Sequence, residues 1–332
     1  MRARIVFFGN LGLGLLVLGF VLWRYGGPAL DILAADPSIP LLLAFGTTVS
    51  LSIACLSWRW GYLLAGLAQS LSLGRLMLYR SAAHSLALLI PSGKLGGDPL
   101  RIWLEIRSGI PPDSAVGSVA VDRAQEIGST APFSLIFAAL LVQAEVPHLD
   151  RAFMIVAVGS VGLIAGLFLA TRRLRRGSGL VSALLRSTRL DRISFIRSQS
   201  EWIDKSEKAI VKLADQRQRM IVSFIAGLVS NLIVIAEFAL LLHAFDLPAN
   251  TTAIAAAIFA TGAAHLLPIP AGIGVLEGAQ IWIFGMLGYS ADVGMAVGLV
   301  IRLRELAWML PGVVYLLLRP IRAGQKEPPD PG

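Results

Sequence analysis

The sequence contains very few metal ligands and little charge. Its single cysteine, Cys55, excludes a disulfide within the chain. The four histidines, His84, His148, His243 and His265, do not fall at metal-ligand spacing, so we expect no metal and no cofactor. Charged residues make up 15% of the 332 residues, against roughly 25% in an ordinary soluble domain. This composition argues against a soluble globular protein.

Two enzyme motifs are also absent. The sequence has no Gly-x-Ser-x-Gly segment, the strand-to-helix turn that carries the serine of many hydrolases. Gly93 and Lys94 are followed by Leu95 rather than by Ser or Thr, which excludes a phosphate-binding P-loop. We therefore assign no catalytic residue and expect that the chain is not an enzyme.

Long apolar runs dominate what is present. Five stretches carry no charged side chain and are each long enough to cross a hydrocarbon core of about 30 Å as a helix. They predict an all-α, polytopic membrane protein with a single membrane domain over residues 1–332. The stretches are Ile5–Trp23, Ile39–Trp58, Ile127–Ala144, Ala152–Ala170 and Met220–Ala236.

The basic residues predict the orientation of these spans, because short cytoplasmic loops carry an excess of Lys and Arg. Both termini are expected in the cytoplasm, and residues 145–151 outside. The basic positions that support this are Arg2 and Arg4 before the first run, Arg59, Arg75 and Arg80 after the second, loop 172–219, and Arg319 and Arg322 at the start of a tail, 320–332, expected to be disordered.

The loop 172–219 holds 13 basic and 5 acidic residues, which accounts for the whole net charge of +8. The remaining sequence is neutral, so the basic charge does not indicate nucleic-acid binding. Ile196, Ile203 and Ile210 recur every seven residues in the loop, as on the apolar face of an amphipathic helix. Such a helix could dock on the anionic cytoplasmic leaflet, or it could be a solvated connector between spans.

A repeat at one constant offset of 179 residues is the most informative pattern. Residues 90–132 match residues 269–311 without a gap at 11 of 43 positions, including rare residue types. Chance is a poor explanation for identical Trp, Pro, Arg and Glu. The pairs are Ile90/Ile269, Pro91/Pro270, Gly93/Gly272, Ile102/Ile281, Trp103/Trp282, Gly109/Gly288, Asp113/Asp292, Val121/Val300, Arg123/Arg302, Glu126/Glu305 and Pro132/Pro311.

Three expected spans lie between the start of the first copy, about 81–143, and the start of the second, about 252–318, and an odd number of crossings would invert the second copy. Inverted repeats are typical of transporters with a central site. In each copy an apolar segment runs into a Pro/Gly-rich break, 91–97 or 268–274, which predicts a broken, re-entrant helix. Asp98, followed by Pro99, is a typical helix start, so Asp98 could be only a cap or could also bind a ligand.

The third helix of each copy carries Arg-x-x-Glu, a spacing that puts both charges on one face. Arg302 is expected deep in the bilayer, where charge is expensive and often functional. The pairs could lock helices together or bind a lipid phosphate. Glu237 is expected to pair with an arginine, with a proton relay as the alternative. The candidate substrate-binding residues are Lys94, Asp98, Arg101, Arg123, Glu126, Glu277, Arg302 and Glu305.

These motifs resemble the transmembrane flippase region of lysylphosphatidylglycerol synthetases and related membrane proteins, including hopanoid-associated ones. The resemblance implies an inner-membrane protein that translocates lipids. Asp98 stands where the family usually has Glu, and Ala271-Gly272 where it has Gly-Gly. The resemblance rests on Pro91…Gly96-Gly97-Asp98-x-x-Arg101 with Gly109, and on Pro268-x-Pro270-x-Gly272-Ile273-Gly274-x-x-Glu277 with Arg302.

Three functions follow as hypotheses. A flippase-like transporter would move an anionic phospholipid or isoprenoid phosphate between leaflets, with Arg123 and Arg302 holding the phosphate. A lipid-phosphate hydrolase would need a nucleophile or metal-binding carboxylates, for which Ser92, Asp98 and Glu277 are the candidates. A non-catalytic partner of envelope-lipid biosynthesis enzymes would use the same charges for complex assembly.

Overall fold

The computed structural model describes residues 2–90, 95–144, 149–175, 200–267 and 269–318, and within these ranges the chain is helical, with no strand. Lys94, Ser92, Ile196 and the tail 320–332 lie outside the described residues. The all-α prediction is confirmed. The α-helices are α1 (Arg2–Ala34), α2 (Ile39–Ala65), α3 (Leu73–Leu89), α4 (Asp98–Arg107), α5 (Pro112–Gln143), α6 (Leu149–Arg175), α9 (Ser200–Ala214), α10 (Arg217–Ala244), α11 (Thr251–Leu266), α12 (Val275–Met286) and α13 (Ala291–Leu318).

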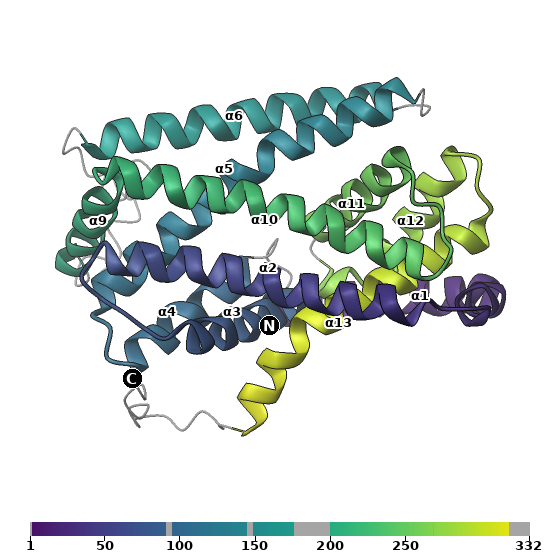
Figure 1. Ribbon diagram of the computed structural model, residues 1–332, viewed down its shortest axis with the longest axis horizontal. Helices are drawn as coiled ribbons and strands as arrows, with labels where there is room; N and C mark the ends of the chain where they lie inside the picture. Colours follow the sequence, from purple (N-terminus) through teal and green to yellow (C-terminus); the bar gives the residue numbers. More distant parts are fainter. Residues whose placement is uncertain (1, 91–94, 145–148, 176–199, 268, 319–332) are drawn as a thin grey trace.

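Four of these helices are long and apolar enough to cross a membrane: the Gly14–Ala34 part of α1, and α2, α5 and α10. The protein is therefore a multi-pass membrane protein. The predicted run Ala152–Ala170 lies within α6 but is not among these four. The helices α2 and α10 lie side by side along the long axis, with α3 and α4 towards one end and α11 and α12 towards the other (Figure 1).

The repeat appears in the structure as a repeated series of elements. In the first copy α3 is followed by a break, a 3₁₀ turn at Leu95–Gly97, α4 and α5; in the second, α11 is followed by a break, a 3₁₀ turn at Pro270–Gly272, α12 and α13. Two residues after each short helix stands a glycine with positive φ, Gly109 (93°) or Gly288 (86°), as is common after helix C-termini. The inverted orientation and the re-entrant character remain predictions.

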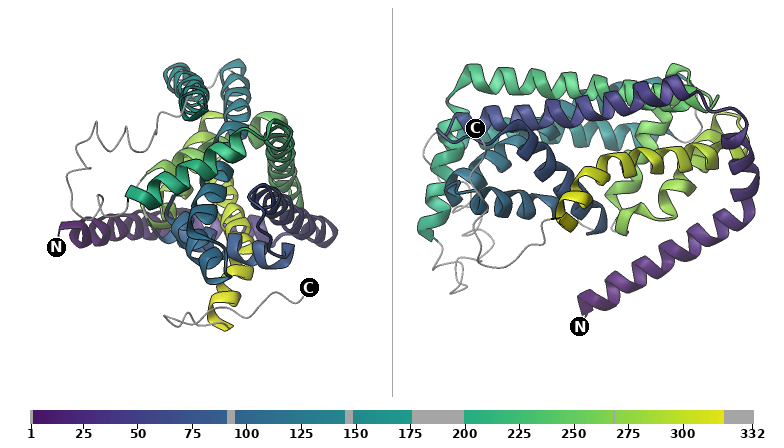
Figure 2. Two further views of the ribbon diagram at one scale, coloured as in Figure 1. Left: turned by 90° about the vertical axis from the view of Figure 1, so that its left-hand side faces the viewer. Right: turned by 60° about the horizontal axis from the view of Figure 1, so that its bottom comes forward.

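The helix α9 falls within the basic loop, as the sequence predicts, but its apolar side packs on protein. Ala209 and Leu213 are buried against residues of α2 and α5, with Ile210 beside them. A Cβ at Gly117 of α5 would lie 2.7 Å from the Ala209 Cβ, so the two helices pack closely. Lys208 is exposed on the other side. The described part of this apolar face therefore packs on protein, and docking of the loop on the leaflet stays a prediction. Figure 2 shows α9 across one end of the bundle.

The hydroxyl of Ser81 in α3 makes hydrogen bonds with the backbone of α13 on both sides of a proline. Pro311 lies inside α13, where a proline ring disrupts the helical hydrogen bonds. The Ser81 hydroxyl donates to the Trp308 carbonyl oxygen (2.6 Å) and accepts from the Gly312 N–H (2.8 Å). One hydroxyl therefore bridges the Trp308 carbonyl and the Gly312 N–H across the kink, and it joins the first copy to the second.

Gly312→Ala should destabilise the protein, because its Cβ would overlap the backbone of Ser81 and Ala82. Overpacking of this kind costs about 1–3 kcal/mol or more. Thermal unfolding of the purified protein should show a lower midpoint. The matched control is Gly278→Ala in α12, where a new Cβ meets nothing within 4 Å. An unchanged midpoint for Gly312→Ala would contradict the close contact between α3 and α13.

Candidate functional site

The carboxylate of Asp122 holds three arginines in the first half of the chain. Its Oδ1 accepts from the Arg59 Nε (2.8 Å), and its Oδ2 accepts from the Nη2 atoms of Arg80 (2.6 Å) and Arg101 (2.7 Å). Asp122 and Arg59 are completely buried, and the other two arginines nearly so. The four residues come from α5, α2, α3 and α4, so one carboxylate ties four helices together.

This position corrects one interpretation of the sequence. Arg59 and Arg80 were expected in a cytoplasmic loop, where they would set the orientation of the spans. Instead they lie inside α2 and α3 and are buried. Both arginines therefore form ion pairs within the helix bundle. They no longer count as loop residues that favour the predicted orientation of the termini.

A second ion-pair group adjoins the first. Arg123 donates from Nε and Nη2 to both carboxylate oxygens of Asp98 (2.8 and 2.9 Å) and from Nη1 to the Glu126 Oε1 (3.0 Å). The Glu126 Oε2 lies 3.6 Å from the Arg80 Nη1 and 3.7 Å from the Arg59 Nη2. The predicted pairing of Arg123 with Glu126 is thus confirmed. Asp98 is the first residue of α4 and Gly97 is the N-cap residue, so Asp98 does not occupy the cap position that the sequence suggested.

Together these groups form a cluster, here called the arginine cluster, with more positive than negative charge. It contains four arginines and three carboxylates, a formal charge of +1. Three guanidinium nitrogens in it, the Arg59 Nη1, the Arg80 Nε and the Arg101 Nε, are buried without a hydrogen-bond partner. Buried polar groups normally have partners, so these N–H groups favour an anion nearby. The members are Arg59, Arg80, Arg101, Arg123, Asp98, Asp122 and Glu126.

The second copy contains the equivalent ion pairs, but there the N–H groups of the arginine are all taken up by acceptors within the protein. Arg302 donates from Nε and Nη2 to Glu277 (2.7 and 3.1 Å) and from Nη1 to Glu305 (2.7 Å). Its Nη1 and Nη2 also donate to the carbonyl oxygens of Ala271 (2.6 Å) and Gly272 (3.0 Å). A guanidinium has five N–H groups, and these five contacts use them all. Arg302 therefore clamps the break before α12.

Further contacts complete this second cluster. The Glu277 Oε2 accepts from the Gly274 N–H (2.9 Å), which lies at a positive φ of 77° at the start of α12. The Glu305 Oε1 lies 2.7 Å from the His265 Nε2. Glu277 and Glu305 are both buried. These contacts join the ends of α11 and α12 to α13.

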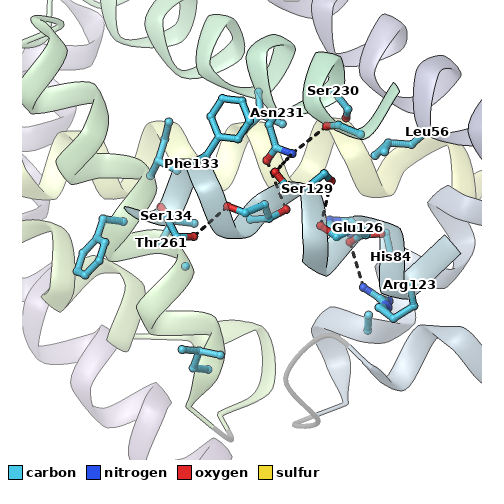
Figure 3. Close-up of a pocket in the computed structure, with 18 of the residues that line it drawn as sticks. Leu56, His84, Arg123, Glu126, Ser129, Phe133, Ser134, Ser230, Asn231 and Thr261 are labelled. Carbon is cyan, nitrogen blue, oxygen red and sulfur yellow. Dashed lines mark hydrogen bonds and ion pairs between the residues drawn. The ribbon is translucent and has the colours of Figure 1, made fainter. Parts of the chain in front are cut away.

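A cavity of about 690 Å³ opens beside the arginine cluster. Figure 3 shows Arg123 and Glu126 at one end of it and Phe133 and Ser134 farther along α5. Of the described residues, no member of the Arg302 cluster lines it. Its polar wall includes Arg59, Arg80, Asp98, Arg101, Arg123, Glu126, Ser129 and Asn231, and its apolar wall includes Phe133, Phe137, Ile155, Val234, Phe238, Ile258, Phe259 and Leu266.

A glycine of α10 gives the cavity its shape near the charges. A Cβ at Gly227 would lie 2.5 Å from the Ser129 Oγ and 3.1 Å from the Arg59 Nη1. The Asn231 side chain donates to the Gly227 carbonyl oxygen (2.9 Å) and to the Ser129 carbonyl oxygen (3.4 Å). The absence of a side chain at this position therefore lets α10 lie close to the buried guanidinium.

Glu237 pairs with an arginine, as predicted, and the partner is Arg304. The Arg304 Nε and Nη2 both lie 2.6 Å from the Glu237 Oε2, and the Trp308 Nε1 donates to the same oxygen (3.2 Å). The Glu237 Oε1 is buried without a hydrogen-bond partner. Arg304 and Trp308 line the cavity. The proton-relay alternative for Glu237 remains a prediction.

The structure therefore brings half of the predicted site to the cavity. Asp98, Arg101, Arg123 and Glu126 line it, whereas Glu277, Arg302 and Glu305 form the separate second cluster. Sequence reasoning missed Asp122 altogether. Asp122 stands beside Arg123 in α5, and the Arg-x-x-Glu motif drew attention to its neighbours only. Within the described ranges, no group of three or more His, Cys, Asp and Glu residues is placed to hold a metal.

Comparison with known proteins gives one result. A family model described as "Lysylphosphatidylglycerol synthase TM region" matches residues 6–312. The match includes both copies of the repeat and the described residues that line the cavity. No curated protein matches the chain.

Asp122→Asn should destabilise the protein strongly, because it leaves three buried arginines without their shared carboxylate. Breaking a buried ion pair from one side costs about 3–5 kcal/mol. Unfolding of the purified protein in mixed detergent micelles should show this loss. Asp36→Asn is the control, because Asp36 is exposed and its substitution should change the free energy of unfolding by less than about 0.5 kcal/mol. Equal stability of the two variants would contradict the role of Asp122.

Arg302→Lys should loosen the second break although it keeps the charge. An ammonium group has three N–H groups and cannot reproduce the five contacts of the planar guanidinium. We expect a loss of about 1–3 kcal/mol and faster protease cleavage near residue 271. Arg217→Lys, at an exposed position, is the matched control. Wild-type cleavage rates in the Arg302 variant would argue against the clamp.

Proposed function

Because the chain belongs to the lysylphosphatidylglycerol synthase TM region family, we propose that it moves an anionic lipid between the leaflets of the inner membrane. The lipid would be a phospholipid or an isoprenoid phosphate. Membership of the family supports a membrane protein in lipid-related processes.

The observation that carries the proposal is the division of the cavity into a basic end and an apolar wall. A lipid has the same division, with a charged headgroup joined to apolar chains. The cavity volume of about 690 Å³ lies within the range of roughly 300–1,000 Å³ typical of ligand pockets. It would accommodate a headgroup and the first part of the chains, with the rest of the chains in the bilayer.

The arginine cluster supports a phosphate as the recognised group. Guanidinium groups bind phosphate oxygens through short, charge-assisted hydrogen bonds. Arg123 has an exposed fraction of 20% in its side chain, so it is open to the cavity. Arg302 was expected to share this role, but its N–H groups are all used by Glu277, Glu305 and the carbonyl oxygens of the break. The phosphate site therefore belongs to the first copy, with Arg59 and Arg80 behind Arg123.

The placement of the repeat supports transport rather than static binding. Residues of α2 to α6, α10, α11 and α13 line the cavity, so both copies contribute to its wall. Transporters with inverted repeats place their site between the copies and open it to each side in turn. An inverted arrangement with both termini in the cytoplasm would make the same motion possible here.

The test is lipid exchange in reconstituted vesicles. Protein-containing vesicles with fluorescent phosphatidylglycerol, or with a labelled polyprenyl phosphate, should expose inner-leaflet label to an external quencher faster than empty vesicles. Arg123→Gln removes charge-assisted hydrogen bonds worth about 1.5–3 kcal/mol, so it should slow exchange about tenfold or more. Arg217→Gln is the control and should exchange lipid at the wild-type rate.

Two results would overturn the proposal. Exchange no faster than in empty vesicles for every anionic lipid would exclude a translocase. Phosphate released from the lipid in the same vesicles, and lost on Ser92→Ala, would instead assign the cavity to a lipid-phosphate hydrolase. Both readouts come from one preparation.

A further inference from the structure

Glu126 is the most open charged group of the arginine cluster. Its side chain has an exposed fraction of 34%, against 20% for Arg123 and 15% for Asp98. It lines the cavity, and Figure 3 shows it beside Arg123. A ligand that enters the cavity therefore meets this carboxylate at the surface of the cluster.

The carboxylate of Glu126 faces three arginines that have other partners. Its oxygens lie 3.0 Å from Arg123, 3.6 Å from Arg80 and 3.7 Å from Arg59. Arg123 already makes two hydrogen bonds to Asp98, and the other two already bind Asp122. The two longer distances exceed hydrogen-bond length, so Glu126 holds these arginines only loosely.

We propose that the Glu126 carboxylate occupies the subsite of the lipid phosphate, and that the phosphate binds by displacing it. This inference rests on the proposed function and adds a competing ligand built into the chain. A phosphate has more oxygens than a carboxylate and can contact all three guanidinium groups at about 2.7–2.9 Å. Glu126 can leave by rotation of its side chain, because it is exposed to the cavity.

Competition between the Glu126 carboxylate and the lipid phosphate lowers the apparent affinity of the protein for the lipid. When a site is accessible for only a fraction of the time, the apparent affinity of its ligand falls by that fraction. In a translocase this keeps lipid binding weak enough for release, and the carboxylate replaces the departing phosphate so that the arginines are never left without an anion. Removing the competitor should therefore tighten lipid binding.

The second copy supplies a matched control. Glu305 is the residue equivalent to Glu126, and it pairs in the same way with Arg302. Its side chain is only 7% exposed, and it does not line the cavity. Glu305→Gln therefore makes the same chemical change where no phosphate can enter.

The experiment measures binding of fluorescent phosphatidylglycerol to the full-length protein in nanodiscs of neutral lipid. Glu126→Gln keeps the shape of the side chain and removes its charge, and it should tighten the apparent affinity roughly fivefold or more. Glu305→Gln should bind as the wild type does. Glu126→Asp keeps the charge but shortens the side chain, and it should give an intermediate affinity. A purely structural role for Glu126 predicts weaker binding or none, never tighter binding.

The outcomes separate the inference from the proposed function. Unchanged or weaker binding by Glu126→Gln, in a wild type that binds and exchanges the lipid, overturns the competition. Weaker binding confined to lipids with an amine in the headgroup would assign Glu126 to that amine instead. A wild type that neither binds nor exchanges any anionic lipid overturns the proposed function itself. If Glu126→Gln does not fold, the affinity of Glu126→Asp decides, because only competition predicts an increase.

Discussion

The architecture around the cavity depends on the burial of one carboxylate among three guanidinium groups. Charges in a membrane protein are expensive to bury, and each needs a partner within the protein. Asp122 meets this need for Arg59, Arg80 and Arg101 at once, and each arginine comes from a different helix. The positions of α2, α3 and α4 relative to α5 therefore follow from a requirement of electrostatics rather than from apolar packing alone. The polar end of the cavity lies where these four helices meet.

The two copies of the repeat use the same ion-pair geometry for different purposes. In both, an arginine binds a carboxylate 25 residues earlier and a glutamate three residues later. In the second copy the arginine also binds two backbone carbonyl oxygens and closes the break. In the first copy three additional arginines surround the pair and make an excess of positive charge beside the cavity. The same ion-pair arrangement thus serves as a clamp in the second copy and, in the proposed function, as part of an anion site in the first.

Much of the fold could be predicted from the sequence, because apolar runs and repeated motifs are local signals. The helical class, most of the spans, the short helix after each break and the Arg-x-x-Glu pairs all follow from them. The centre of the site could not be predicted in this way. The equivalent of Asp122 in the second copy is the apolar Ile301. A comparison of the two copies for shared charged residues therefore does not find Asp122. Arg59 and Arg80 follow long apolar runs and resemble loop charges, since only the packing of helices distant in the sequence shows that they are buried. For the same reason the sequence did not show whether the apolar side of α9 faces lipid or protein.

The bridge from Ser81 to the kink at Pro311 restricts how the halves can move. At Gly312 the backbones of α13 and α3 touch without an intervening side chain, so sliding along this contact would bring larger side chains into collision. Ser81 also adjoins Arg80 in α3, so the contact with α13 and one arginine of the cluster are neighbours on the same helix.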